Sequence, residues 1–179
     1  MQEEPTLESR RIYDGKVVAL RVDTIRLPDG GTATREVVEH GASVVMVPVD
    51  DRGQVLLVRQ YRKSAEQSLL EAPAGGLEEG ESPEDGVLRE LQEEIGHTAG
   101  KLERMTGFWI APGFCTEYMH TYIATDLRPS ALAPDEDESI EVVPTPLEHI
   151  SELIRSGEIQ DGKSVAALLM ALHVFADRL

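Results

Sequence analysis

Residues 75–96 read GGLEEGESPEDGVLRELQEEIG, and the second half of this stretch has the marks of a short amphipathic helix. Ser82 is a favoured N-cap residue, and Pro83 suits the first turn because its missing N–H would have no helical partner there. Gly96 can end the helix in a left-handed conformation. The sequence therefore predicts a helix that begins after Ser82 and ends near Gly96.

Three carboxylates gather on one side of this helix. At 3.6 residues per turn they lie within about 100° of arc, opposite the apolar face; they are Glu90, Glu93 and Glu94. The apolar residues that we expect to pack inward are Leu88, Leu91 and Ile95. Like charges four residues apart cost a helix about 0.2–0.5 kcal/mol, and anions in its last turn cost about 0.3–1 kcal/mol. The cluster is either the solvated side of an ordinary helix or a site for Mg²⁺ or Mn²⁺, which bind hard oxygen ligands.

The spacing of the whole segment favours the second interpretation. It fits G-x5-E-x7-R-E-U-x-E-E-x-G, where U is aliphatic, with Gly75 first and Gly96 last. At average residue frequencies, such a match at a given position has a chance on the order of one in 10⁸ to 10⁹. The segment resembles the signature of the Nudix hydrolases, which cleave nucleoside diphosphates linked to another moiety. His97 departs from it, because an aliphatic residue usually follows the last glycine.

The surrounding sequence indicates an α+β fold, with helices flanking a mixed sheet. Strand-like stretches precede and follow the central helix; they cover residues 16–27, 32–39, 42–49, 55–62, 101–110, 117–125 and 140–143. Two helices are expected at the end, one over about 146–155 and one that starts near Ser164 as its cap. The Nudix resemblance implies a mixed sheet sandwiched by helices. We expect residues 1–41 to form a small antiparallel sheet and residues 42–179 the hydrolase domain.

Composition narrows the classes of function. The 179 residues include 33 acidic and 17 basic side chains, so the net charge is −16. Such a surface repels nucleic acid and anionic lipid. The single cysteine, Cys115, fits a reducing compartment. No apolar stretch is long enough to span a bilayer, and the acidic start of the chain is unlike a secretory signal. We therefore expect a soluble cytoplasmic protein without a nucleic-acid or membrane partner.

Outside the signature, the chain resembles the ADP-ribose pyrophosphatase branch of the Nudix hydrolases. The similar motifs are VRQYR at 58–62, LEAPAGG at 70–76, APGFCTE at 111–117 and PDEDESIEVV at 134–143. Pro112, 16 residues after Gly96, resembles a marker of that branch. The resemblance implies Mg²⁺-dependent hydrolysis of ADP-ribose to AMP and ribose 5-phosphate. The alternatives are a GDP-mannose or other nucleotide-sugar pyrophosphatase, and a nucleotide-sensing regulator without catalysis.

The resemblance also assigns the metal site. It implies two or more Mg²⁺ ions, with Mn²⁺ as a substitute, held by the backbone carbonyl of Ala74 and the side chains of Glu90, Glu94 and Glu93. Arg89 is expected to orient the loop by pairing with Glu81 or Glu93. An ordinary surface pair between Arg89 and Asp85 is the alternative.

The remaining catalytic and substrate-binding roles fall mostly outside the signature. The resemblance places the general base in an acidic loop, where Glu138 ranks ahead of Glu136; Glu117 is a third candidate and Glu93 is also counted among the catalytic residues. The arginines expected to meet phosphate or ribose are Arg62, Arg35 and Arg59, because arginine grips phosphate with two parallel hydrogen bonds. A solvated acidic linker and plain surface charges are the alternatives. The N-terminal hairpin resembles the sheet through which this branch forms homodimers; a plain extension of the core sheet within a monomer is the alternative.

Overall fold

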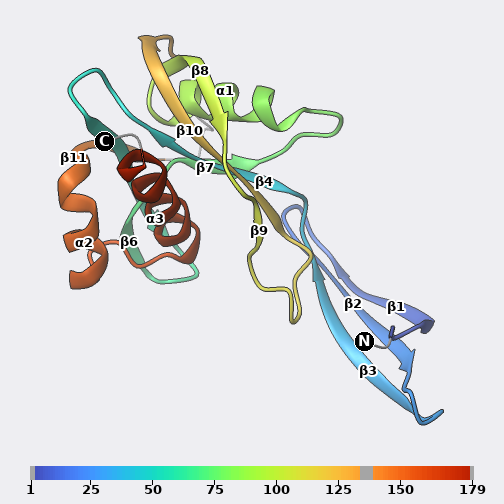
Figure 1. Cartoon of the computed structure of the whole chain (residues 1–179). Coiled ribbons are helices and arrows are strands. Elements are labelled where there is room, and N and C mark those ends of the chain that lie inside the picture. The colour runs from blue at the N-terminus through green and yellow to red at the C-terminus, as the bar shows by residue number, and fades with distance from the viewer. Residues whose placement is uncertain (1–2, 134–138, 178–179) are drawn as a thin grey trace. The chain divides into compact units, whose positions relative to one another are not determined.

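The computed structural model describes residues 3–133 and 139–177 and divides the chain into two compact units (Figure 1). One unit contains the chain up to Ala42 together with Trp109–Tyr118, and the other contains Ser43–Phe108 and the chain from Met119 onward. The strands are β1 (Thr6–Asp14), β2 (Ala19–Arg26), β3 (Thr32–Glu39), β4 (Ser43–Pro48), β5 (Gln54–Arg62), β6 (Gln67–Glu71), β7 (Ala74–Gly76), β8 (His97–Arg104), β9 (Phe108–Trp109), β10 (Tyr118–Pro129) and β11 (Ile140–Pro146). The helices are α1 (Pro83–Glu94), α2 (Ile150–Ser156) and α3 (Gly162–Ala176), with a 3-10 turn at Leu147–His149.

The first unit is built on an antiparallel sheet of three strands in the order β1-β2-β3. The predicted hairpin is confirmed as β2 and β3, which pair from Ala19↔Glu39 to Arg26↔Thr32. Gly30 turns the chain between them with a φ of 87°, a value that glycine adopts without strain. The sequence did not predict β1, whose residues are exposed throughout and carry no buried face to give the strand away.

The second unit holds two sheets. One is mixed and contains the order β7-β4-β10-β8, in which β4 runs parallel to β10 while the outer pairs are antiparallel. The other is antiparallel, in the order β11-β5-β6. Strand β4 therefore joins segments that are far apart in sequence, because it pairs with β7 along one edge and with β10 along the other.

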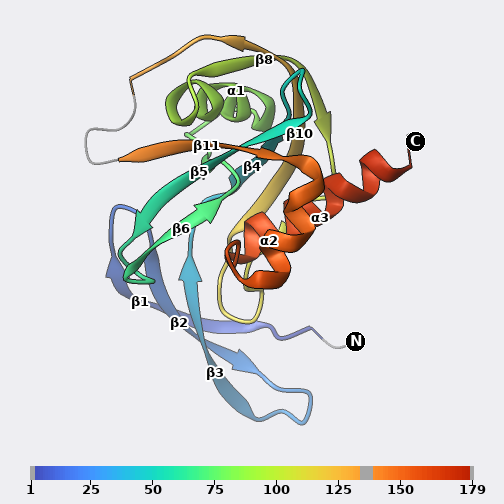
Figure 2. The same ribbon diagram turned by 90° about the vertical axis from the view of Figure 1, so that its left-hand side faces the viewer.

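Strand β4 is buried along its whole length, as its unbroken apolar sequence predicts. Because side chains alternate across a strand, β4 supplies two separate cores. Val44 and Met46 pack in a cluster with Leu91 of α1, whereas Val45 and Val47 pack in a cluster with residues of α2 and α3. Figures 1 and 2 show α1 on one side of the sheets and α2 and α3 on the other. The predicted α+β sandwich is confirmed.

Helix α1 begins and ends where the sequence predicts. The hydroxyl of Ser82 accepts a hydrogen bond from the amide of Asp85 at 3.1 Å, and Gly96 has a φ of 68°. The predicted inward face is wrong in one respect, since Val87 is fully buried while Leu88 is only half-buried.

The start of α3 corrects another prediction. Its N-cap is Asp161, whose carboxylate accepts from the amide of Ser164 at 3.2 Å. Ser164 lies inside the helix and its hydroxyl bonds elsewhere. Both residue types can cap a helix, and the structure selects the earlier one.

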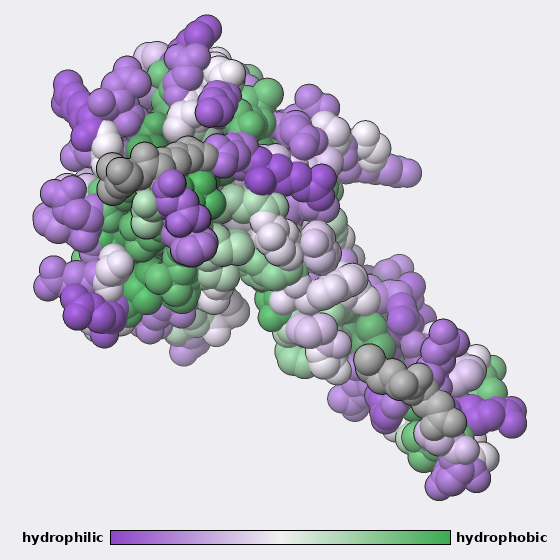
Figure 3. Space-filling model, in the orientation of Figure 1, coloured by the Kyte–Doolittle hydropathy of each residue, from purple (hydrophilic) through white to green (hydrophobic). Residues whose placement is uncertain are grey.

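Hydrophilic side chains dominate the face shown in Figure 3, with smaller hydrophobic areas between them. Among the helices of residues 3–133 and 139–177, none has the length and apolar character needed to cross a membrane.

Candidate functional site

Strand β7 and helix α1 bring the signature residues together within the second unit. The amide of Ala74 donates a hydrogen bond of 3.0 Å to Oε2 of Glu94. At the next residue, Gly75, an added Cβ would lie 1.8 Å from Oε1 of Glu90. Only glycine leaves room for that carboxylate, which explains in physical terms why the signature has a glycine there. The backbone of 74–75 and two carboxylates of α1 thus form one site.

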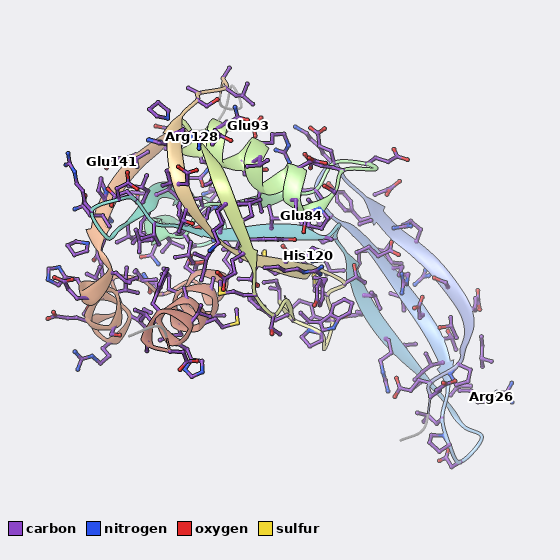
Figure 4. All side chains as sticks on the ribbon, turned by 45° about the horizontal axis from the view of Figure 1, so that its top comes forward. Arg26, Glu84, Glu93, His120, Arg128 and Glu141 are labelled. Carbon is purple, nitrogen blue, oxygen red and sulfur yellow. The ribbon has the colours of Figure 1, made fainter. Side chains whose placement is uncertain are left out.

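The carboxylate side of α1 is not a solvated face. Glu90 and Glu94 have relative exposures of 8% and 7%, so both are buried in the protein. Taking carboxylates out of water is costly even when they have partners, so a helix optimised only for folding would place apolar residues here. Figure 4 labels Glu84 and Glu93, near opposite ends of this helix. The burial favours the interpretation of a site over that of an ordinary amphipathic surface.

Arg89 is the cation that holds this cluster. Its guanidinium contacts Glu81 through two hydrogen bonds of 2.9 and 3.0 Å, Glu90 at 2.7 Å and Glu93 at 2.9 Å. It also donates to the carbonyl of Gly76 at 2.8 Å, which ties α1 to the end of β7. The structure therefore shows pairing with both expected glutamates, and the alternative pair with Asp85 is not formed.

Charge pairing changes the proton affinities in this network. Hydrogen bonds from Arg89 hold the pKa of Glu81 below its usual value, against a smaller opposing effect of burial. In turn, the hydrogen bonds to Glu81 raise the pKa of Arg89 above its ordinary value. Both shifts favour the charged forms, so Arg89 and Glu81 are both ionised at neutral pH.

The donor set fits a hard divalent cation, although the structure places Arg89 and the Ala74 amide against its carboxylates. Among the described residues, no group of three or more His, Cys, Asp or Glu side chains stands in the arrangement of a metal site. Carboxylate and carbonyl oxygens are nonetheless the ligands of Mg²⁺ and Mn²⁺. The close approach of Gly75 to Glu90 puts the backbone of β7 beside these oxygens. The residues that would hold a metal are Glu90, Glu94, Glu93 and the carbonyl of Ala74.

The three predicted substrate arginines all form ion pairs. Arg62, at the end of β5, donates to both carboxylate oxygens of Glu71 at 2.9 and 2.8 Å. Arg59, also on β5, pairs with Glu158 at 2.8 Å. The third arginine belongs to the other unit, where it contacts Glu4 at 2.6 and 3.0 Å; it is Arg35.

The candidate bases are placed differently. Glu117 lies in the first unit, with its Oε1 3.8 Å from Nδ1 of His40. Glu93 lies in the last turn of α1 and accepts from Arg89. Glu136 and Glu138 lie outside the described residues.

The sequence analysis missed a second charged cluster, formed by Glu71, Arg62, Lys163 and Asp161. Glu71 is 1% exposed and accepts from both Arg62 and Lys163. Lys163 also contacts Asp161 at 2.7 Å. The available signal was the acidic Glu71 directly after two leucines of a buried strand, because a charge in such a strand needs a partner.

Comparison with known proteins gives one family. The model described as "NUDIX domain" matches residues 39–168, and the model described as "Nucleoside diphosphate sugar hydrolase N-terminal domain" matches residues 4–38. An ADP-ribose pyrophosphatase of Bacillus subtilis (strain 168) is 42% identical over 170 residues, 93% of this chain and 91% of that protein. A GDP-mannose pyrophosphatase of Salmonella arizonae is 35% identical over 150 residues, 78% of each chain.

The fold has a counterpart among solved structures. The structure titled "Crystal structure of ADP compounds hydrolase" superposes with a TM-score of 0.91 and covers 99% of this chain and 97% of its own, at 24% identity. At that identity the likeness supports the architecture alone.

Proposed function

This chain belongs to the Nudix hydrolase family, and we propose that it hydrolyses the diphosphate of ADP-ribose to give AMP and ribose 5-phosphate. The observation that carries the proposal is the pair of buried carboxylates, Glu90 and Glu94, against the backbone of Ala74 and Gly75. The substrate follows from the name of the Bacillus subtilis relative, which this chain matches over nearly its full length.

The charges of protein and substrate require a cation between them. The chain carries −16 and the diphosphate of ADP-ribose is itself anionic, so the two repel each other. We assign the metal to Glu90, Glu94, Glu93 and the Ala74 carbonyl, with two or more Mg²⁺ ions and Mn²⁺ as a substitute. When bound, Mg²⁺ lowers the pKa of water and stabilises charge on a leaving phosphate. Arg89 orients the carboxylates that hold it.

The remaining roles belong to other side chains. Glu138 is proposed to take the proton of the attacking water, with Glu136 and Glu117 as the next candidates, because the signature carboxylates are engaged in the metal site. For the substrate, Arg62, Arg35 and Arg59 are proposed to grip phosphate or ribose. For Arg35 and Arg59, whose partners Glu4 and Glu158 are exposed, an incoming phosphate would replace one charge-assisted pair by another. Arg62, in contrast, would have to meet the phosphate while still paired with the buried Glu71.

A second substrate, GDP-mannose, is supported by the Salmonella arizonae relative. The metal site would be the same, because the base and the sugar lie on either side of the diphosphate that is cleaved. A non-catalytic nucleotide sensor is disfavoured, because such a protein has no need of the signature glutamates, all of which this chain retains.

The test is a product assay with Mg²⁺ and a panel of ADP-ribose, GDP-mannose and other nucleotide sugars. We expect AMP from ADP-ribose to be the fastest product, and faster release of GMP would favour GDP-mannose. Glu94→Gln keeps an oxygen for the Ala74 amide but loses the charge that binds metal, so turnover should collapse. Glu152→Gln, at an exposed position of α2, is the matched control. Unchanged turnover in Glu94→Gln would refute the metal assignment.

We also propose that the chain forms a homodimer through the N-terminal sheet and works in the cytoplasm. The resemblance of that sheet to the appended sheet of the branch supports the dimer. Light scattering coupled to gel filtration tests it: a mass near 39 kDa is expected, about twice the 19.7 kDa of the chain, and a mass near 20 kDa contradicts it.

A further inference from the structure

The strand that leads into the carboxylate site is fastened to the start of α3. Glu71, the last residue of β6, is 1% exposed, and two cations contact its carboxylate. Arg62 approaches from β5 with bonds of 2.9 and 2.8 Å, and Lys163 approaches from the first turn of α3. Burial alone would raise the pKa of Glu71, but hydrogen bonds and charge from Arg62 and Lys163 outweigh it and lower that pKa. The buried carboxylate is therefore ionised and held from two sides.

A buried hydroxyl fastens the next residue. The amide of Ala72 donates a 2.7 Å hydrogen bond to Oγ of Ser164, although the two residues are 92 positions apart. Ser164 is fully buried, and its own amide is capped by Asp161. Asp161 also contacts Lys163 at 2.7 Å, so one residue fixes both the helix start and the lysine. The first turn of α3 thus presents a charge and a hydroxyl to two consecutive residues of the strand.

The fastened segment runs directly to the site. After Glu71 and Ala72, the carbonyl of Pro73 accepts from the amide of Met46 at 3.0 Å. Ala74 follows, and its amide donates to Glu94 at 3.0 Å. Each of the four residues from Glu71 to Ala74 is therefore bonded to a neighbouring element: the first two to α3, Pro73 to β4 and Ala74 to α1. A displacement of Glu71 and Ala72 would also displace Ala74, because so short a segment has few backbone torsions that can absorb the change.

We propose that Glu71, Lys163 and Ser164 are positioning residues, through which α3 holds Ala74 in register with Glu94 for metal binding. This rests on the proposed function in one respect, because Ala74 and Glu94 matter for catalysis only if they hold the metal. None of the three touches the carboxylates of α1 in the contacts described above. They act through the backbone of residues 71–74, much as outer residues orient metal ligands in other sites.

Two variants test the proposal and two others serve as references. Lys163→Met removes one cation of Glu71, and Ser164→Ala removes the bond to Ala72. Lys163→Arg restores the charge. Thr145→Val is the matched control, since it removes another buried hydroxyl, which donates to a backbone carbonyl of β11 at 3.1 Å. Thermal unfolding of every variant shows how much general stability each has lost.

The first measurement is hydrogen exchange of the Ala74 amide, followed by NMR in metal-free protein. We expect exchange about tenfold faster in Lys163→Met and Ser164→Ala, and near wild type in Lys163→Arg and Thr145→Val. The second is Mn²⁺ affinity from the electron paramagnetic resonance of free Mn²⁺. Here we expect a loss of about 10-fold to 100-fold in the same two variants.

Two results would overturn the proposal. One is exchange of Ala74 and Mn²⁺ affinity that stay at wild-type values in both variants; the other is an equal effect in Thr145→Val, which would mean a general loss of stability. A wild type that binds no Mn²⁺ refutes the metal assignment instead. In that case the Ala74 exchange rates still decide whether α3 positions this residue against Glu94.

Discussion

Arg89 holds Glu81 by two parallel hydrogen bonds of 2.9 and 3.0 Å, joining the middle of α1 to the residue before its N-cap. The remaining N–H groups of the same guanidinium reach Glu90, Glu93 and the carbonyl of Gly76. A planar fork with five donors can satisfy all of these acceptors at once, which a lysine ammonium cannot.

Arg89→Lys should therefore lower the free energy of unfolding by about 1.5–3 kcal/mol, the range for lost hydrogen bonds to charged groups. Urea denaturation measures the change. Arg128→Lys is the matched control, because Arg128 forms a single exposed pair with Asp126, and we expect a change there of less than about 0.5 kcal/mol. Equal effects of the two substitutions would contradict the role of Arg89.

Neighbouring glycines allow a steric test of the site. In Gly75→Ala the new Cβ would lie 1.8 Å from Oε1 of Glu90, whereas at Gly76 nothing lies within 4 Å of that position. We expect Gly75→Ala to displace Glu90, to lower kcat at least tenfold and to cost about 1–3 kcal/mol of stability through overpacking. Gly76→Ala should leave both quantities near wild type. Similar kinetics for the two variants would show that the carboxylate moves aside without loss.

The free energy of unfolding at alkaline pH should depend on Tyr122. Burial, and then the 2.8 Å hydrogen bond to Glu84, raises the pKa of Tyr122 to about 12. A tyrosine in the unfolded chain has a pKa of about 10. Because the pKa is higher in the folded protein, the contribution of Tyr122 to the free energy of unfolding is complete below about pH 10 and is lost as the pH rises towards 12.

Tyr122→Phe should accordingly be less stable than wild type at pH 7, by about 1 kcal/mol for the lost hydrogen bond. The difference should shrink above pH 10 and change sign before pH 12, because a rise in pKa from about 10 to about 12 corresponds to about 2.7 kcal/mol, more than the hydrogen bond contributes; urea unfolding at each pH follows it. Absorbance at 295 nm gives an independent check, since the wild-type minus variant signal should titrate near pH 12. A stability difference that stays constant to pH 12 would contradict the shift.

Measurements of kcat and of Mn²⁺ affinity can distinguish the proposed general base from the proposed metal ligands. Glu138→Gln should lower kcat by about 10²–10⁴, the usual contribution of a general base, while Mn²⁺ affinity stays near wild type. Steady-state kinetics and the Mn²⁺ titration are measured on the same preparation, with Glu136→Gln and Glu117→Gln in parallel. If kcat of Glu138→Gln is undiminished, the role passes to whichever of the other two variants is impaired.

Local signals in the sequence were sufficient for α1. The cap at Ser82, the glycine at position 96 and the exact spacing of the glutamates are all properties of one continuous segment. They predicted the helix, its ends and the family. The same kind of reasoning placed Leu88 in the core instead of Val87, because it took the carboxylates as the outward face.

Contacts between residues far apart in the sequence could not be predicted from the sequence alone. Nothing near Ser164 indicates that its hydroxyl bonds to Ala72, and so the residue was read as a helix cap. Arg62 was predicted from a motif, but its partner, Glu71, became visible only once β5 and β6 were paired. Strand β1 was not predicted because it has no buried side. Its sequence therefore lacks the alternation of apolar and polar residues that distinguishes a strand from a polar loop.

Because the side chains of β4 belong to two cores, the strand limits which changes in sequence length this protein can tolerate. A shift of the strand by one residue would send Val44 and Met46 to the side of α3, and Val45 and Val47 to the side of α1, exchanging the contents of both cores together. We therefore expect an insertion or deletion inside β4 to disrupt both cores at once. Turns such as the one at Gly53 are where we expect the chain to tolerate changes in length, because an added residue there leaves the register of the strand unchanged.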